Sequence, residues 1–92
     1  MIKKSILKVS IRQIKAARAL LGWSQDDLAK VAGVSIPTIK RLEAVDGPLG
    51  GRGETIERII ASIRAAGIEF IEENGGGPGV RLRKPSKQKT QN

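Results

Sequence analysis

Apolar residues recur at helical spacing in four segments of the first two thirds of the chain. Serines stand where the first three helices would begin, at Ser10, Ser24 and Ser35, because a serine hydroxyl accepts hydrogen bonds from the unpaired N–H groups of a helix N-terminus. Gly22 and Gly33 stand where the first two helices would end, because glycine adopts a positive φ without strain. The apolar positions of the four predicted helices are Ile11, Ile14, Ala17 and Leu21; Leu28, Ala29, Val31 and Ala32; Ile39 and Leu42; and Ile56, Ile59, Ile60 and Ile63.

Two local features refine the start of the second helix. Ser24 and Asp27 have the spacing of a capping box, in which each side chain bonds the backbone N–H of the other residue. Trp23 precedes them at a position from which it can pack on Leu28 as a hydrophobic staple, so we interpret it as a core residue. The glycine-rich segment 47–53 between the third and fourth helices is predicted to be a loop.

The pattern changes after Gly67, where the fourth helix is predicted to stop. Segments 68–73 and 80–83 are rich in β-branched or alternating residues and flank a glycine-rich turn, which predicts a β-hairpin. Acidic residues of its first strand are available to pair with Arg81 and Arg83 of its second. An isolated two-stranded hairpin is only marginally stable in water, so this one must pack on the helices or on a second copy of itself.

The net charge of +8 is concentrated at the two ends of the chain. Residues 1–18 contain six basic side chains and no acidic one, and residues 81–92 contain five basic side chains and no acidic one. Residues 19–80 contain six basic and nine acidic side chains. Basic ends around a nearly neutral middle favour attraction to a polyanion, most simply to nucleic acid phosphates. An anionic membrane fits less well, because no segment combines a basic face with a large apolar face.

Composition excludes several classes of protein. Without cysteine or histidine there is no disulfide, no zinc finger and no Ser-His-Asp relay, and we expect no metal, no cofactor and no enzymatic activity. Aromatic residues make up only 2% of the chain, which disfavours a base-stacking sheet. No run approaches the ~20 apolar residues of a membrane span, and there is no secretory leader, so we expect a cytoplasmic, nucleoid-associated protein.

The second and third predicted helices are joined through Gly33 and Val34 alone, which is the arrangement of a helix-turn-helix. The small Ala29 lets the two helices approach, and apolar residues fill the space between them. The run Gly-Trp-Ser-Gln-Asp-Asp-Leu-Ala-Lys-Val-Ala-Gly-Val-Ser at 22–35, followed by Ile-Lys-Arg-Leu-Glu at 39–43, resembles the phage repressor and Cro (XRE) family of DNA-binding domains. The resemblance covers residues 10–66 and implies a mainly α fold, a bundle of four to five helices, here with a C-terminal β-hairpin.

The resemblance implies that helix 35–43 lies in the major groove. The residues that match base-reading positions, or lie beside them, are Ile36, Pro37, Thr38 and Arg41. Arg41 is the strongest candidate, since a guanidinium can donate two hydrogen bonds to guanine O6 and N7. Thr38 could contact a base or a thymine methyl. Ile36 and Pro37 depart from the glutamine-rich helices common in the family and offer only apolar contact, so DNA shape should carry more of the specificity.

The resemblance also implies backbone contacts at the N-terminus of the second helix, where unpaired N–H groups and the helix dipole favour phosphate. The expected phosphate contacts are Ser24, Gln25, Ser35, Lys40 and Arg52. Arg18 and Glu43 match positions that often form a structural ion pair between the first and third helices, so Arg18 is expected to belong to the scaffold.

From these residues we predict a transcriptional regulator that binds an inverted repeat in double-stranded DNA as a homodimer. The predicted parts are a basic arm at 1–9, a DNA-binding domain at 10–67, a dimerisation hairpin at 68–84 and a disordered basic tail at 85–92. Dimerisation is expected to involve Ile68, Phe70, Ile71, Val80 and Leu82.

Three other functions stay open. Small proteins of this family also act as antitoxins, which bind a toxin and their own operator. Asp26 and Asp27 could contact RNA polymerase or another regulator. The charge alone could make the chain a general nucleic-acid coater. A nucleotide-binding loop is disfavoured, because no Lys-Ser/Thr pair follows the glycines of 47–53.

Overall fold

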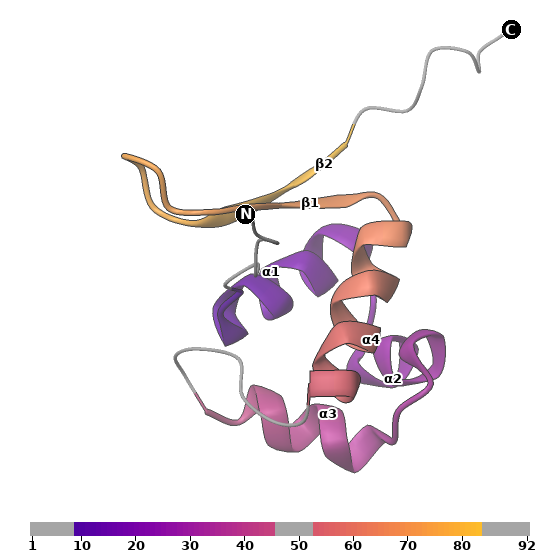
Figure 1. Cartoon of the computed structure of the whole chain (residues 1–92). Helices are drawn as coiled ribbons and strands as arrows, with labels where there is room; N and C mark the ends of the chain where they lie inside the picture. Colours follow the sequence, from indigo (N-terminus) through magenta and orange to yellow (C-terminus); the bar gives the residue numbers. More distant parts are fainter. Residues whose placement is uncertain (1–8, 46–52, 84–92) are drawn as a thin grey trace, which may run out of the picture.

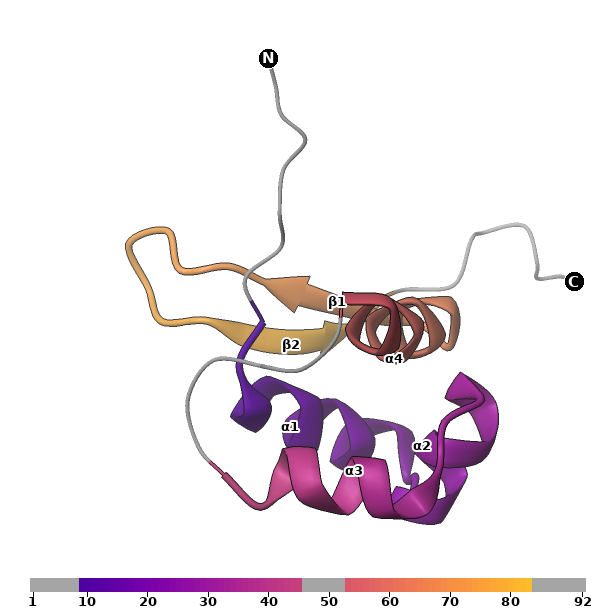
Figure 2. The same cartoon turned by 60° about the horizontal axis from the view of Figure 1, so that its bottom comes forward.

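The structure, a computed structural model, describes residues 9–45 and 53–83. These residues form four helices followed by a two-stranded antiparallel hairpin, in agreement with the sequence pattern. Figures 1 and 2 both show α1 between the hairpin on one side and α3 on the other, with α2 and α4 beside them. The elements are α1 (Ile11–Leu21), α2 (Gln25–Ala32), α3 (Ile36–Glu43), α4 (Gly53–Ala65), β1 (Ile68–Ile71) and β2 (Gly79–Leu82).

The loop before α4 and the N-terminal arm differ from the prediction at their boundaries. Gly53, assigned to a loop, is the first residue of α4, and the rest of that predicted loop, with Arg52, lies outside the described residues. The predicted basic tail and the predicted arm up to residue 8 also lie outside them. Val9, the last residue of that arm, is 6% exposed and belongs to the hydrophobic core.

The first three helices begin at the predicted serines. Each serine hydroxyl accepts a hydrogen bond from a backbone N–H in the first turn, at 3.2 Å in α1, 3.0 Å in α2 and 3.2 Å in α3. The capping box of α2 is complete, because the carboxylate of Asp27 accepts the backbone N–H of Ser24 at 2.9 Å. Hydrogen bonding of the Asp27 carboxylate to the backbone N–H of Ser24, and then to the Ser24 hydroxyl, lowers the pKa of Asp27. Gly22 and Gly33 end α1 and α2 with φ of 71° and 72°. A positive φ of this size explains why both positions are glycine.

The hydrophobic core joins the helices to the hairpin. Trp23, Val34 and Leu42 are partly buried against it, as the sequence pattern predicts. Burial of this apolar surface is the main force that holds the short helices together, because helices of this length are marginal alone. The buried core residues are Val9, Ile14, Ala17, Leu28, Ala29, Ala32, Ile39, Ile59, Ile63, Ile68 and Phe70.

Glu69 and Arg81 lie directly opposite each other in the hairpin, and their side chains form the predicted cross-strand ion pair at 3.0 Å. Phe70 lies opposite Val80 in the same register. β1 is shorter than the predicted segment 68–73, since it ends before the two glutamates that precede the turn, and β2 runs one residue earlier than the predicted segment 80–83. Side chains alternate along β1, with Ile68 and Phe70 buried and Glu69 exposed.

The hairpin packs on α1 and α4 of its own chain, which is one of the two arrangements that the sequence leaves open. Ile68 and Phe70, two of the predicted dimer residues, are 0% and 8% exposed within a single chain. Of the other three, Ile71 and Val80 are half-buried and Leu82 is 49% exposed. The inner side of the hairpin is therefore already used by the monomer's core.

A buried glutamine fixes the hairpin to α1. The side-chain amide of Gln13 donates to the carbonyl oxygens of Ile71 and Gly79, at 3.2 and 2.9 Å, and so bridges the two strands next to the turn. Its own oxygen accepts the backbone N–H of Ser10 at 2.9 Å, which completes a capping box in α1. Gln13 was not among the residues predicted from the sequence, although a glutamine three positions after an N-cap serine is the signal for such a box.

Candidate nucleic-acid interface

A two-residue turn positions α3 against α2. The N–H of Val34 donates to the carbonyl of Ala29 at 3.0 Å, and Gly33 supplies the positive φ that reverses the chain. Arg58 of α4 donates to the carbonyl of Gly33 at 3.3 Å and so ties the turn to the rest of the bundle. Ala29 is 3% exposed where α2 and α3 pack together. This is the geometry of a helix-turn-helix.

One side of α3 faces away from the core and carries four exposed side chains. Ile36 and Pro37 form an apolar pair at the N-terminus of α3, with Ile36 37% exposed. Lys40 and Arg41 follow one helical turn later on the same side. Within the described part of the chain, neither of these two cations forms an ion pair. We call these four residues the α3 surface.

The small polar residues at the start of α3 bond to each other. The hydroxyls of Ser35 and Thr38 lie 2.8 Å apart, and the Ser35 hydroxyl also accepts the backbone N–H of Thr38. Thr38 is half-buried. Of the four predicted base-reading residues, Thr38 is thus the least accessible, and its hydroxyl already has a partner.

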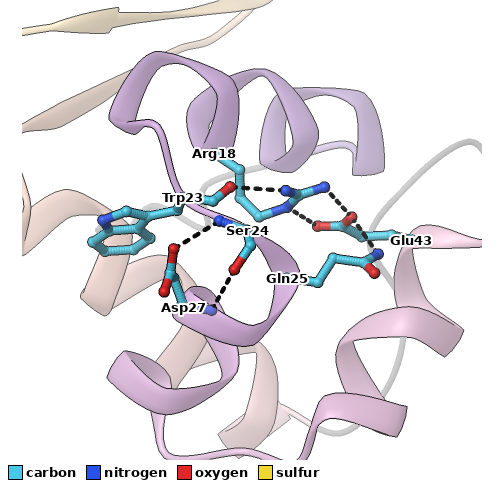
Figure 3. Close-up of polar contacts among 6 residues, drawn as sticks. All are labelled: Arg18, Trp23, Ser24, Gln25, Asp27 and Glu43. Carbon is cyan, nitrogen blue, oxygen red and sulfur yellow. Dashed lines mark hydrogen bonds and ion pairs between the residues drawn. The ribbon is translucent and has the colours of Figure 1, made fainter.

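A polar cluster behind the α3 surface connects three helices (Figure 3). Arg18 of α1 donates from Nε and Nη2 to the two carboxylate oxygens of Glu43 at 2.8 and 2.7 Å, and from Nη1 to the carbonyl of Trp23 at 2.9 Å. The side chain of Glu43 is only 3% exposed. The predicted ion pair is confirmed, and Arg18 belongs to the scaffold.

The third member of this cluster, Gln25, was not predicted to belong to it. Gln25, predicted to contact phosphate, donates from its side-chain amide to Glu43 Oε1 at 2.9 Å. An amide nitrogen carries two hydrogens, so one donor of Gln25 is available for a further acceptor. Glu43 therefore orients both the start of α2 and the end of α3.

The charges in the cluster stabilise each other. Burial alone would raise the pKa of the Glu43 carboxyl, but hydrogen bonds from Arg18 and Gln25 and the charge of Arg18 outweigh it and hold the pKa below its ordinary value. The hydrogen bond to Glu43 raises the pKa of Arg18 although burial opposes it. Both groups are charged at neutral pH, so the cluster is an ion pair rather than a neutral hydrogen-bonded pair.

Other kinds of site have little support in the described part of the chain. Its acidic residues form no group of three or more that could hold a metal ion. None of the four described helices has the length and apolar character needed to cross a bilayer.

Comparison with known families gives the same assignment as the geometry. Residues 14–44, which run from the first half of α1 to the end of α3, match the helix-turn-helix family HTH_3. This part of the chain is therefore a helix-turn-helix domain of the Cro/C1 type, and DNA is its implied partner. A search of curated proteins found no significant match to the chain.

Proposed function

We propose that the protein is a sequence-specific transcriptional regulator that places α3 in the major groove of DNA. The observation that carries this proposal is the α3 surface, where cationic and apolar side chains share one side of a helix whose other side is fixed to α1. Arg41 donates to guanine O6 and N7, which discriminates against other bases by about 1 to 3 kcal/mol. Lys40 contacts a phosphate and adds affinity without specificity.

The apolar half of the α3 surface reads thymine. Ile36 and Pro37 offer no hydrogen bonds, and the only apolar group that the major groove presents is the C5-methyl of thymine. The α3 surface has no amide side chain to bond adenine, so direct readout covers few base pairs, and DNA shape supplies the rest.

In this proposal, contacts to the DNA backbone lie on either side of the major groove. Ser24 and Gln25 lie at the N-terminus of α2, where unpaired N–H groups and the helix dipole favour a phosphate. The second amide hydrogen of Gln25, oriented by Glu43, donates to the same phosphate. Ser35 and Arg52 complete the proposed contacts to the DNA backbone.

We propose that two copies bind an inverted repeat, because a single helix in the groove reads too few base pairs for regulatory specificity. Residues 10–67 would bind DNA, and the hairpin at 68–84 would carry the contacts between copies. Ile68 and Phe70 support the hairpin from inside, so direct contacts fall to the more accessible Ile71, Val80 and Leu82. Replacing Leu82 by lysine should then lower the dimer mass in sedimentation without unfolding the chain, and an unchanged dimer would exclude this interface.

The functional test compares the two cations of the α3 surface by fluorescence anisotropy with a labelled duplex. Arg41→Ala should weaken binding to the preferred sequence by roughly tenfold or more and leave binding to unrelated DNA nearly unchanged. Lys40→Ala should weaken binding to both duplexes alike and reduce the salt slope by about one. Equal losses on both duplexes in the two variants would contradict sequence reading by Arg41.

A further inference from the structure

Three exposed arginines gather at the end of the molecule where α4 and β2 finish. Arg83 donates from its guanidinium to the backbone carbonyl of Arg64 at 3.1 Å and from its backbone N–H to Gly67 at 2.8 Å, so it lies at the C-terminus of α4. Arg81 is two residues away on β2 and therefore on the same side of the strand. We call Arg64, Arg81 and Arg83 the far basic surface.

The far basic surface is remote from α3. The hairpin, α1 and α3 are successive layers in Figures 1 and 2. Packed helices and sheets lie about 8 to 10 Å apart, so two layer spacings separate β2 from α3 by roughly 20 Å. Charges interact over only about 8 Å at physiological ionic strength. DNA bound at α3 therefore leaves these arginines unneutralised.

The positive charge of this surface is only partly compensated within the described residues. Glu69 pairs with Arg81, but both side chains are well exposed, at 46% and 61%, and such pairs are weak. Arg64 and Arg83 form no ion pair in the described ranges 9–45 and 53–83. In the sequence, Arg83 is followed by Lys84, Lys87 and Lys89 with no acidic residue up to the end of the chain given.

We propose that the far basic surface is a second, sequence-independent binding surface for DNA phosphates, so that a molecule bound through α3 can hold another duplex segment. The guanidinium group suits this role because it binds phosphate oxygens through two parallel hydrogen bonds. A membrane fits less well, since the one large apolar side chain among these arginines, Leu82, points to the other side of the strand and gives no apolar face for insertion. The inference rests on the proposed function only for the first duplex.

The test measures both duplexes at once. A duplex of the preferred sequence is attached to beads, full-length protein is added, and capture of a labelled duplex of unrelated sequence is recorded. Arg64→Gln/Arg83→Gln removes two charges and keeps a polar side chain at both positions. Lys15→Gln/Lys30→Gln is the matched control, because it also removes two positive charges, one from α1 and one from α2.

We expect the Arg64→Gln/Arg83→Gln protein to bind the first duplex within about twofold of the parent and to capture the second at least about fivefold less. The control variant should capture it normally, and capture by the parent should fall steeply with added salt. Undiminished capture by Arg64→Gln/Arg83→Gln would overturn the proposal, because the second duplex would then be held elsewhere, for instance by α3 of another copy. The proposal is also overturned if Arg64→Gln/Arg83→Gln loses dimer mass in sedimentation. It is overturned as well if the parent protein binds the first duplex but captures no second duplex. Failure of the parent to bind the first duplex would instead remove the proposed function itself.

Discussion

Arg18 of α1 binds the carboxylate of Glu43 in α3 through two hydrogen bonds, of 2.8 and 2.7 Å, and thereby fixes the helix that carries the α3 surface. The Glu43 side chain is 3% exposed and that of Arg18 is 19% exposed. Removing the arginine would leave a buried carboxylate without its charged partner, which is far costlier than breaking a surface pair.

We therefore expect Arg18→Ala to lower the free energy of unfolding by about 3 kcal/mol, measured by urea denaturation. Lys15→Ala, an exposed lysine on the same helix, should change it by less than about 0.5 kcal/mol. In the double variant Arg18→Ala/Glu43→Ala the loss should be smaller than the sum of the single losses. A loss below about 1 kcal/mol for Arg18→Ala would show that the pair contributes little.

The same pair should make stability depend on pH. The pKa of Glu43 is lower in the folded chain than its ordinary value of about 4.3, so the folded state releases this proton more readily. The resulting stabilisation is fully present above the ordinary pKa and is lost as the pH falls through the folded-state pKa. Asp27, whose pKa is also lowered, acts with the same sign.

Urea midpoints measured from about pH 7 down to pH 3 should therefore fall below about pH 5 in the parent. Glu43→Gln should be less stable than the parent at neutral pH and should show a smaller decrease in acid. Asp27→Asn provides the comparison, because it removes the other shifted carboxyl and leaves the buried pair intact. If Glu43→Gln keeps the full pH dependence of the parent, the acid sensitivity does not come from Glu43.

The hairpin should depend on the amide of Gln13. Gln13→Ala loses two hydrogen bonds to the strands and the capping bond to Ser10, and we expect a loss of about 2 kcal/mol in stability. Gln13→Glu separates these contributions, because a carboxylate can still accept from Ser10 but cannot donate to Ile71 and Gly79. Hydrogen exchange of the β1 and β2 amides should accelerate in both variants. Normal protection in Gln13→Glu would show that the hairpin is held by apolar packing alone.

Ile36 should make binding sensitive to a single methyl group on the DNA. Replacing the contacted thymine by uracil removes the C5-methyl, and losing one buried methyl costs about 0.8 kcal/mol, or roughly fourfold in affinity. Ile36→Ala should bind both duplexes equally. Val31→Ala is the control, since Val31 is also exposed, at 53%, but lies on α2. If replacing thymine by uracil weakens binding by the same factor in Ile36→Ala as in the parent, the methyl is contacted by another residue.

Features set by short-range patterns could be predicted from the sequence. The caps at Ser10, Ser24 and Ser35 and the turn at Gly33 each depend on residues within a few positions of one another, so their spacing was sufficient. Cross-strand pairing of an acidic residue with an arginine followed in the same way from the alternation around a glycine-rich turn, although the particular pair of Glu69 and Arg81 was set by the register of the strands. The pair of Arg18 and Glu43, which are distant in sequence, was predicted only through the resemblance to a known family.

Apart from the capping bond between Gln13 and Ser10, which is local, the contacts that were missed join elements far apart in the chain. Nothing in the local pattern indicates that Gln13 reaches Ile71, which is 58 residues away. For the same reason the pattern did not show that the hairpin turns its apolar side to α1 and α4, which makes Ile68 and Phe70 core residues. Gln25 was predicted to contact a phosphate from the family resemblance and from its place at a helix N-terminus, and its bond to Glu43 depends on how α2 and α3 pack.

Sequence reading by α3 through Arg41 is tested by selecting bound duplexes from a random pool. The selection is run with the parent protein and with Arg41→Ala. We expect an inverted repeat for the parent, with a guanine preference in each half-site that the variant loses. A pool without sequence preference, recovered equally by both proteins and released by salt, would contradict sequence reading by α3.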